Sequence, residues 1–361
     1  MSSRRIPAPW ERVYDIHGIR VAVRADSAAV AAGAERALGD FAALSTRGTG
    51  GAAAGARAVE IDLHDGGTPR PLPPDAEPQF RHARVRCYRH RGELWFTDRD
   101  GTVVVDPEAG RAEGHVAAPG DPSRAHGAAR PVRELHDDPL FTFPLLELLR
   151  HRGLFHVHAA GLARGERGVL LPGDTGAGKS TLTVSLIRAG WDYLSDDALL
   201  LRAGPAGVEA LAVPDEFHLD PALGERFPEL AVLAEREAYN AGPRRAFRPE
   251  EVYDRSPVPA CVPSLILFPQ IGPGGTRAEA MTPSQALTAL IRASALVLLD
   301  ERVAAPHLDA LRRLVSQCRC YRLCHGPDAL ADPERVPRLV EQLLEVARRQ
   351  TPDASQDAGL P

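Results

Sequence analysis

The chain has 361 residues, 44% of them hydrophobic and 25% charged, with a formal net charge of −5 at pH 7. These values are typical of a globular protein with room for two domains, and the lack of a basic excess argues against a nucleic-acid partner. No run approaches the roughly 18 apolar residues of a membrane helix, so we expect no membrane partner. The five cysteines are an odd number, which argues against a disulfide framework. Because no apolar segment of a secretory signal follows Arg4 and Arg5 either, we expect a cytoplasmic protein.

The first third of the chain has the pattern of short strands separated by polar breaks. Alternating apolar residues over 12–26 predict a hairpin around His17-Gly18. Residues 27–44 predict a helix with Asp26 or Ser27 as its cap. Further strands are expected at 58–64, 83–90, 92–98 and 101–110, with a tight turn at Arg99–Gly101 and loops at 48–56 and 66–78. We therefore predict a β-rich α+β N-terminal domain over residues 1–125, whose role the sequence does not define.

The rest of the chain has the pattern of an α/β domain. A Pro/Gly-rich linker is expected at 117–131, followed by a helix at 140–153 with a glycine stop. Strands and helices then alternate from about Leu154 to Asp332, as in a nucleotide-binding α/β core. An amphipathic helix is expected at 335–350. These features predict a second domain over 126–350 and a disordered tail at 351–361.

The strongest local signal is the segment GDTGAGKS, Gly173 to Ser180, which contains the only lysine of the chain, Lys179. It matches the phosphate-loop template at Gly173, Gly178, Lys179 and Ser180, after an apolar strand at 168–172 and before a helix that stops at Gly190. Backbone amides of such a loop surround phosphate oxygens, while a lysine ammonium reaches the β and γ phosphates. A planar guanidinium fits that place poorly, which accounts for a lysine in an arginine-rich chain.

Two aspartates and two histidines flank the loop. Asp196 and Asp197 follow a predicted strand at 191–194, where one carboxylate could hold Mg²⁺ and the other could take a proton from an incoming hydroxyl. His156 and His158 are predicted on one face of a strand before the loop. A histidine near the phosphates, a metal site, and two histidines at the edge of a core are all compatible with that pattern.

Residues 158–201 around these motifs resemble the catalytic core of the HPr kinase/phosphorylase family, and especially the shorter HPr-kinase-like proteins of bacterial biosynthetic clusters. The likeness is clear over about 140–205 and loose in the rest of the C-terminal half. It implies a P-loop fold similar to phosphoenolpyruvate carboxykinase, ATP as donor and a serine hydroxyl as acceptor. It also implies that His158 assists near the phosphate, that one aspartate is the base, and that Ser180 shares Mg²⁺ with the other acid.

The chain also departs from the family pattern. Thr175 and Thr181 replace its usual Ser and Glu, the acid followed by Arg-Gly is missing, and Glu216 within 214–220 is a weak replacement for that acid. HPr itself and the phosphorylase activity are therefore not expected. The family is often hexameric, but the front half differs, which leaves homo-oligomerisation open.

The resulting hypothesis is a Mg·ATP-dependent kinase acting on a serine-type hydroxyl of a protein or peptide. The expected catalytic residues are His158, Lys179, Asp196 and Asp197, and the expected metal pair is Ser180 with Asp197, although which aspartate is the base stays open. The nucleotide would be bound by a continuous segment: Gly173, Asp174, Thr175, Gly176, Ala177, Gly178, Lys179, Ser180 and Thr181. The alternatives are a small-molecule hydroxyl kinase and a nucleotide sensor that does not transfer phosphate.

Two further clusters are weighed and set aside. Arg244, Arg245 and Arg248 could neutralise a phosphoryl group, but an arginine-rich solvated loop accounts for them. The segment CRCYRLCH, which ends at Cys324-His325, lacks the paired ligand spacing of a zinc site, and its first two cysteines alternate as strand residues do.

Overall fold

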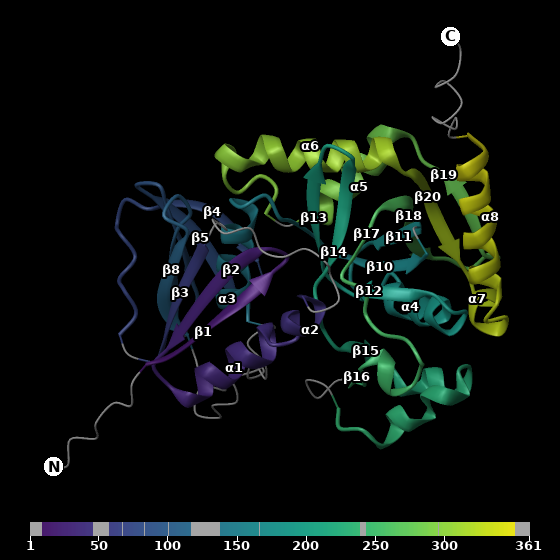
Figure 1. Ribbon diagram of the computed structural model, residues 1–361, viewed down its shortest axis with the longest axis horizontal. Coiled ribbons are helices and arrows are strands. Elements are labelled where there is room, and N and C mark those ends of the chain that lie inside the picture. The colour runs from purple at the N-terminus through teal and green to yellow at the C-terminus, as the bar shows by residue number, and fades with distance from the viewer. Residues whose placement is uncertain are drawn as a thin grey trace, which may run out of the picture. The chain divides into compact units, whose positions relative to one another are not determined.

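The computed structural model describes residues 9–45, 58–66, 68–82, 84–99, 101–116, 138–165, 167–238, 243–294 and 296–350. The chain divides into two compact units (Figure 1). The first comprises Met1–His156 with Leu296–His307, and the second comprises Val157–Ala295 with Leu308–Pro361. The predicted linker at 117–131, the boundary at 125 and the tail at 351–361 lie outside the described residues.

The first unit is built on an eight-stranded mixed sheet in the order β1–β2–β3–β8–β7–β6–β5–β4. The strands are β1 (Trp10–Ile16), β2 (Ile19–Ala25), β3 (Ala58–Asp65), β4 (Glu77–His82), β5 (Val85–His90), β6 (Glu93–Thr97), β7 (Thr102–Asp106) and β8 (Arg111–Val116). The predicted hairpin at His17-Gly18 is confirmed, and both residues have the positive φ of a tight two-residue turn, 51° and 87°.

Strands β4 and β8 were not among the predicted elements. β8 carries the polar, glycine-containing sequence RAEGHV, which has no apolar run of strand length. It is nevertheless paired on both sides, parallel to β3 and antiparallel to β7. Pairing with two neighbours satisfies its backbone groups, so tertiary context rather than local propensity makes this segment a strand.

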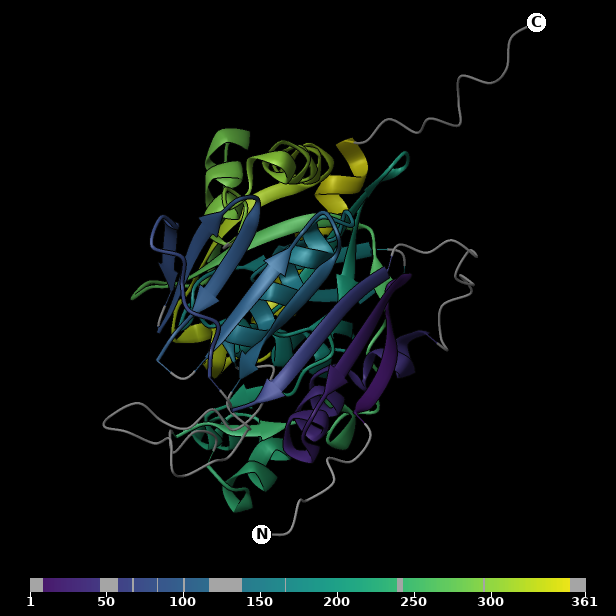
Figure 2. The same ribbon diagram turned by 90° about the vertical axis from the view of Figure 1, so that its left-hand side faces the viewer.

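Three helices pack in the first unit: α1 (Ala28–Leu38), α2 (Phe41–Ser45) and α3 (Pro139–Arg150). Ser27 caps α1 as predicted, because its hydroxyl accepts a hydrogen bond from the amide of Val30 at 3.2 Å. α3 packs against β3, β6, β7 and β8 (Figure 2). Its residue Leu148 is completely buried. Because this apolar helix completes the core of the first sheet, the unit extends to His156 rather than ending near 125.

The first unit contains a buried histidine whose protonation opposes folding. His307 is 1% exposed and stacks on Phe155 with ring centroids 4.8 Å apart. Burial, with smaller contributions from Arg150 and His156, lowers its pKa to about 3. In the unfolded chain this imidazole binds a proton near pH 6.5, whereas in the folded chain it stays neutral at that pH. As the pH falls below 6.5, protonation of the unfolded chain therefore lowers the free energy of unfolding.

Replacement of His307 by leucine is expected to reduce the acid sensitivity of the fold. Between pH 8 and pH 4 the wild type should lose about 3 kcal/mol more of its free energy of unfolding than His307→Leu does. Urea unfolding of the full chain at both pH values measures the difference. The exposed His82→Leu serves as control and should behave as the wild type; equal acid sensitivity of all three proteins would contradict the assignment.

The second unit has the α/β architecture that the sequence predicts, with a main six-stranded sheet in the order β12–β10–β11–β18–β20–β19. Its strands are β10 (Ala159–Arg164), β11 (Arg167–Pro172), β12 (Asp192–Ser195), β18 (Pro263–Ile271), β19 (Arg277–Ala280) and β20 (Arg319–His325). β11, β18 and β20 run parallel to one another. Two smaller sheets contain β13 (Leu199–Gly204), β14 (Gly207–Ala212) and β17 (Ala260–Cys261), and β15 (Phe217–Leu219) with β16 (Arg245–Phe247). The short strand β9 (Phe155–Val157) includes the division between the two units, which falls after His156.

Helices cover this sheet and complete its core. The α-helices are α4 (Lys179–Arg188), α5 (Pro283–Arg292), α6 (Glu301–Gln317), α7 (Asp328–Ala331) and α8 (Arg335–Gln350), and the 3-10 helices are η3 (Pro221–Glu225), η4 (Pro228–Glu235) and η6 (Pro249–Glu251). Leu182 and Leu186 of α4 lie in one buried cluster with Leu171, Leu265 and Val340, from β11, β18 and α8. The predicted strand at 168–172 and the predicted helix at 335–350 are thus confirmed.

Candidate phosphate-binding site

The segment 173–180 connects the end of β11 to the start of α4, the strand–loop–helix arrangement that the sequence predicts. Gly176 and Gly178 have φ values of 89° and 90°, a left-handed conformation that side chains with a Cβ rarely adopt. α4 begins at Lys179, so its unpaired N-terminal amides and the positive end of its dipole lie at the loop. This geometry is suited to binding a phosphate group.

Lys179 is the centre of a polar triad. Its side chain is 5% exposed, and its Nζ donates to the carbonyl of Gly173 at 2.8 Å. The same Nζ lies 2.8 Å from His158 Nε2 and 3.5 Å from Asp197 Oδ1. His158 Nδ1 in turn lies 3.4 Å from Asp197 Oδ2. The structure therefore brings together three of the four predicted catalytic residues.

The electrostatics of the triad define the state of the imidazole. Burial lowers the pKa of His158, and the Lys179 ammonium acts in the same direction, while Asp197 opposes both. A neutral ring accepts the ammonium hydrogen at Nε2 and offers its Nδ1 hydrogen to Asp197. His158 thus connects the cation of the loop to the carboxylate that follows β12.

Asp196, the fourth predicted catalytic residue, lies in a different environment from Asp197. It is 7% exposed, whereas the side chain of Asp197 is 61% exposed. Burial raises the pKa of Asp196 to about 7, although a hydrogen bond from Ser180 and the nearby Lys179 lower it. Its Oδ1 is buried without a hydrogen-bond partner in the described part of the chain.

This arrangement bears on the metal ligands. The sequence pairs Ser180 with Asp197, but the hydroxyl of Ser180 contacts Asp196 and Asp197 contacts the His158–Lys179 pair. Paired oxygen ligands and an unsatisfied buried carboxylate oxygen fit a hard cation such as Mg²⁺. Asp196, rather than Asp197, is therefore the carboxylate that the geometry places beside Ser180.

Sequence reasoning missed one acidic neighbour of this site. The charge of Asp215 contributes to the raised pKa of Asp196, so the two carboxylates lie within electrostatic reach. Glu216, the acid weighed from the sequence, instead lies 3.7 Å from Arg248. Asp215 directly precedes Glu216 in the sequence, and no local signal there distinguishes the two carboxylates.

The remaining predicted candidates lie in other surroundings. His156 belongs to the first unit, beside His307, and does not join the triad. Cys318 and Cys320 are buried, and Cys318 Sγ lies 3.3 Å from the carbonyl oxygen of Pro263. Arg244 is exposed. His156 and His158 thus lie in different units, and the first two cysteines of the CRCYRLCH segment are buried.

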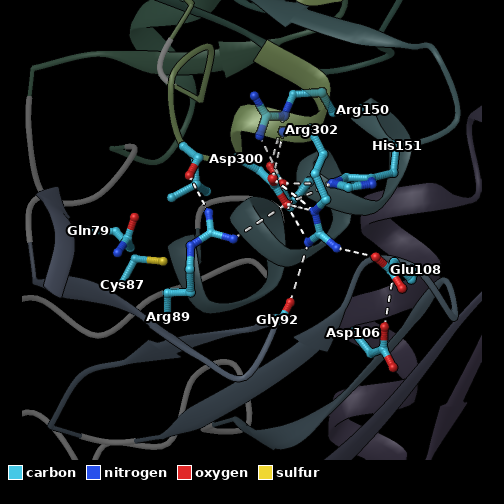
Figure 3. Close-up of polar contacts among 12 residues, drawn as sticks. Gln79, Cys87, Arg89, Gly92, Asp106, Glu108, Arg150, His151, Asp300 and Arg302 are labelled. Atoms are coloured by element: carbon cyan, nitrogen blue, oxygen red, sulfur yellow. Dashed lines mark hydrogen bonds and ion pairs between the residues drawn. The ribbon is translucent and has the colours of Figure 1, made fainter. Parts of the chain in front are cut away.

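A second polar cluster, in the first unit, could be mistaken for a metal site (Figure 3). Ligand atoms of Glu147, His151 and Asp300 lie within 4.8 Å of one another. However, Arg150 donates to both oxygens of Glu147 at 2.9 Å, and Arg302 donates to both oxygens of Asp300 at 2.6–3.1 Å.

Both carboxylates of this cluster therefore already form hydrogen-bonded ion pairs with arginines. Burial opposes the ionisation of Asp300, but the hydrogen bonds from Arg302 outweigh it and lower the pKa of the carboxyl to about 2. Arg89 adds a third guanidinium 3.8 Å from Asp300. A further carboxylate, Glu108, pairs with Arg302 at 2.6 Å, so three guanidiniums balance the charges of three carboxylates. The cluster is therefore an ion-pair network that ties the segment 296–307 into the first unit.

Comparisons with known proteins add little to this description. No family model matches the chain, and the curated proteins contain no significant match. Among solved structures, the HPr(Ser) kinase/phosphatase from Coxiella burnetii aligns with a TM-score of 0.30 and 13% identity, over 54% of this chain and 90% of that protein. A likeness of this size carries no argument about activity. In the described residues, no helix has the length and apolar character needed to cross a bilayer.

Proposed function

We propose that the second unit is a kinase domain that transfers the terminal phosphoryl group of Mg·ATP to a serine-type hydroxyl on a protein or peptide. The observation that carries this proposal is the division of the two adjacent aspartates. Asp196 is buried beside Ser180 at the start of α4, and exposed Asp197 lies against His158 and Lys179. Metal binding and proton transfer would thus fall to separate carboxylates on either side of a phosphate-binding loop.

Nucleotide binding is assigned to the loop and its lysine. The amides of residues 173–181 would donate to phosphate oxygens, and Lys179 would exchange some of its present contacts for the β and γ phosphates. Ser180 and Asp196 would hold Mg²⁺, which when bound supplies positive charge to the phosphates. Asp196 has a free oxygen for this purpose, and its burial excludes competing water.

Phosphoryl transfer is assigned to the triad. Asp197 accepts the proton of the acceptor hydroxyl as the hydroxyl oxygen forms its bond to the γ-phosphorus. The bond from that phosphorus to the β–γ bridging oxygen breaks, and ADP leaves with the electron pair. Lys179 neutralises the charge that develops on the transferred group, while His158 holds the carboxylate of Asp197 in place from its Nδ1 side.

The exposure of Asp197 favours a large acceptor. With 61% of its side chain accessible, this carboxylate can meet a serine presented on a chain that stays in solvent. A small-molecule kinase would instead need to enclose its acceptor to exclude water. The proposed partner is therefore a protein or peptide with an acceptor serine, and the proposed compartment is the cytoplasm, where Mg·ATP is abundant.

Replacement of Asp197 by asparagine tests the proposal directly. Loss of the base is expected to lower kcat by about 10²–10⁴-fold, while Mg·ADP binding stays within about threefold because Asp196 and the loop are intact. Transfer from γ-labelled ATP to serine-containing proteins and peptides measures the first quantity, and calorimetry the second.

The matched control for this experiment is Asp192→Asn, the same change at the start of β12, where the carboxylate makes an ion pair with Arg255. It should leave transfer unchanged. Transfer at the wild-type rate by Asp197→Asn would remove the proposed base, and absence of transfer by the wild type to any serine, with nucleotide bound, would favour a nucleotide sensor.

A further inference from the structure

His325 lies at the edge of the sheet where the phosphate loop begins, although the proposed mechanism does not use it. It ends β20, opposite Ile271 of β18, and β18 runs parallel to β11. Parallel strands bring their C-terminal ends to one edge of a sheet, so β20 ends beside the loop that follows β11. From the sequence, this histidine was considered only as a partner of the neighbouring cysteines.

The imidazole of His325 contacts the loop directly before Lys179. Its Nε2 lies 2.9 Å from the carbonyl oxygen of Ala177, and the residue is 9% exposed. A carbonyl can only accept, so Nε2 carries the hydrogen in this contact. A Cβ placed on Gly178 would lie 2.5 Å from His325 Cε1, which means that the ring packs against the Gly178 backbone.

This hydrogen bond fixes the orientation of one peptide group of the loop. The carbonyl of Ala177 and the amide of Gly178 belong to the same planar trans peptide, so they point in opposite directions. With its carbonyl held by His325, the peptide directs the Gly178 amide away from the imidazole. Gly178 has a φ of 90° and no Cβ, so without this contact the peptide could rotate at little steric cost.

The backbone around His325 is itself held in place. The amide of Gly272 donates to the carbonyl of His325 at 3.1 Å. Asp328 accepts hydrogen bonds from the amide and hydroxyl of Thr276 at 2.7–3.0 Å. A Cβ on Gly326 would lie 1.7 Å from the carbonyl oxygen of Gly274, so the two segments pack too closely for a side chain there. The ring is therefore presented to the loop by a fixed support.

We propose that His325 is a positioning residue of the phosphate loop, whose Nε2 hydrogen bond to Ala177 keeps the Gly178 amide available to a nucleotide phosphate. This inference rests on the proposed nucleotide binding but adds a residue from another strand, 146 positions beyond Lys179 in the sequence numbering. Because His325 acts on binding and touches no reacting atom, its loss affects nucleotide affinity and not the transfer step.

The test compares three substitutions of His325 in the full chain. His325→Phe keeps a ring and removes the donor, His325→Asn has a donor too short to reach Ala177, and His325→Gln places an amide donor near the position of Nε2. The first two should raise the Kd of Mg·ADP and the KM for Mg·ATP by about tenfold, the worth of one hydrogen bond, with kcat within about threefold. His325→Gln should recover most of the affinity, and Cys324→Ser, its neighbour in β20, should match the wild type.

A second readout keeps this inference separate from the proposed function. Hydrogen exchange of residues 173–180 in nucleotide-free protein should be faster in the Phe and Asn variants than in the wild type, and slower again in the Gln variant. Wild-type exchange and wild-type affinity in both the Phe and Asn variants would overturn the inference. If the wild type itself binds no nucleotide, the proposed function fails. The exchange experiment still tests His325 in that case, because unaltered exchange of residues 173–180 in the Phe and Asn variants would contradict its role in positioning the loop.

Discussion

Replacement of Lys179 by alanine is expected to lower kcat/KM for phosphoryl transfer by at least about 10²–10³-fold, the loss that follows removal of one preorganised charge-stabilising donor. Lys179 Nζ is the only ammonium in the chain other than the terminus, and it lies within 3.5 Å of the proposed base. Lys179→Arg should lose most of the activity as well, because the site is 5% exposed and suits a compact ammonium better than a planar fork. Steady-state transfer from labelled ATP measures both variants.

Arg188→Ala provides the control for this prediction, since it removes a cation from the other end of the same helix, where Arg188 pairs with Glu229. It should retain wild-type kinetics. Turnover by Lys179→Ala at the wild-type rate would refute the proposed kinase mechanism, and full activity of Lys179→Arg would refute the steric explanation for the lysine.

Replacement of Asp196 by asparagine is expected to abolish Mg²⁺-dependent transfer while it stabilises the fold above neutral pH. Burial raises the pKa of this carboxyl to about 7 from its usual value of 3.8, so between these pH values the folded protein holds a proton that the unfolded chain has released. The stability is therefore highest below the unfolded pKa and falls as the pH rises to about 7. At pH 8 without metal, Asp196→Asn should unfold with a free energy up to about 4 kcal/mol higher than the wild type, and at pH 4 the two should be nearly equal.

Urea unfolding in EDTA at the two pH values, with Asp192→Asn as the matched control, measures the stability effect. Asp192 is half-exposed and forms an ion pair with Arg255, so its substitution should change the free energy of unfolding by less than about 1 kcal/mol at either pH. A pH-independent difference between Asp196→Asn and the wild type would show that the carboxyl is not buried as described. Normal Mg²⁺-dependent transfer by Asp196→Asn would remove it from the metal site.

The phosphate loop could be predicted from the sequence because its geometry is local. Glycines at the positions that need positive φ, an apolar strand before them and a helix that starts at Lys179 are all properties of one continuous segment. The nearby histidine and the paired aspartates could be selected for the same reason. The hairpin at His17-Gly18 and the Ser27 cap are equally short-range, and both are confirmed.

The different environments of the two aspartates could not be predicted in this way. Adjacent aspartates are equivalent in a sequence, and only the path of the chain after β12 places Asp196 under Ser180 and leaves Asp197 at the surface. Asp215 and His325 come from segments far along the chain, so no local spacing relates them to the loop. Strand β8 was missed because pairing on both sides outweighs its polar composition.

By itself, the amino-acid sequence determined that this chain has a strand–loop–helix segment suited to phosphate, with its one lysine at the start of the helix, because backbone conformation there depends on neighbouring residues. The tertiary structure alone decided which carboxylate is buried, which histidine supports the loop from a distant strand, and why 296–307 belongs with the first unit. These are matters of burial and charge pairing between segments far apart in the chain, and they arise only when the sheets bring those segments together.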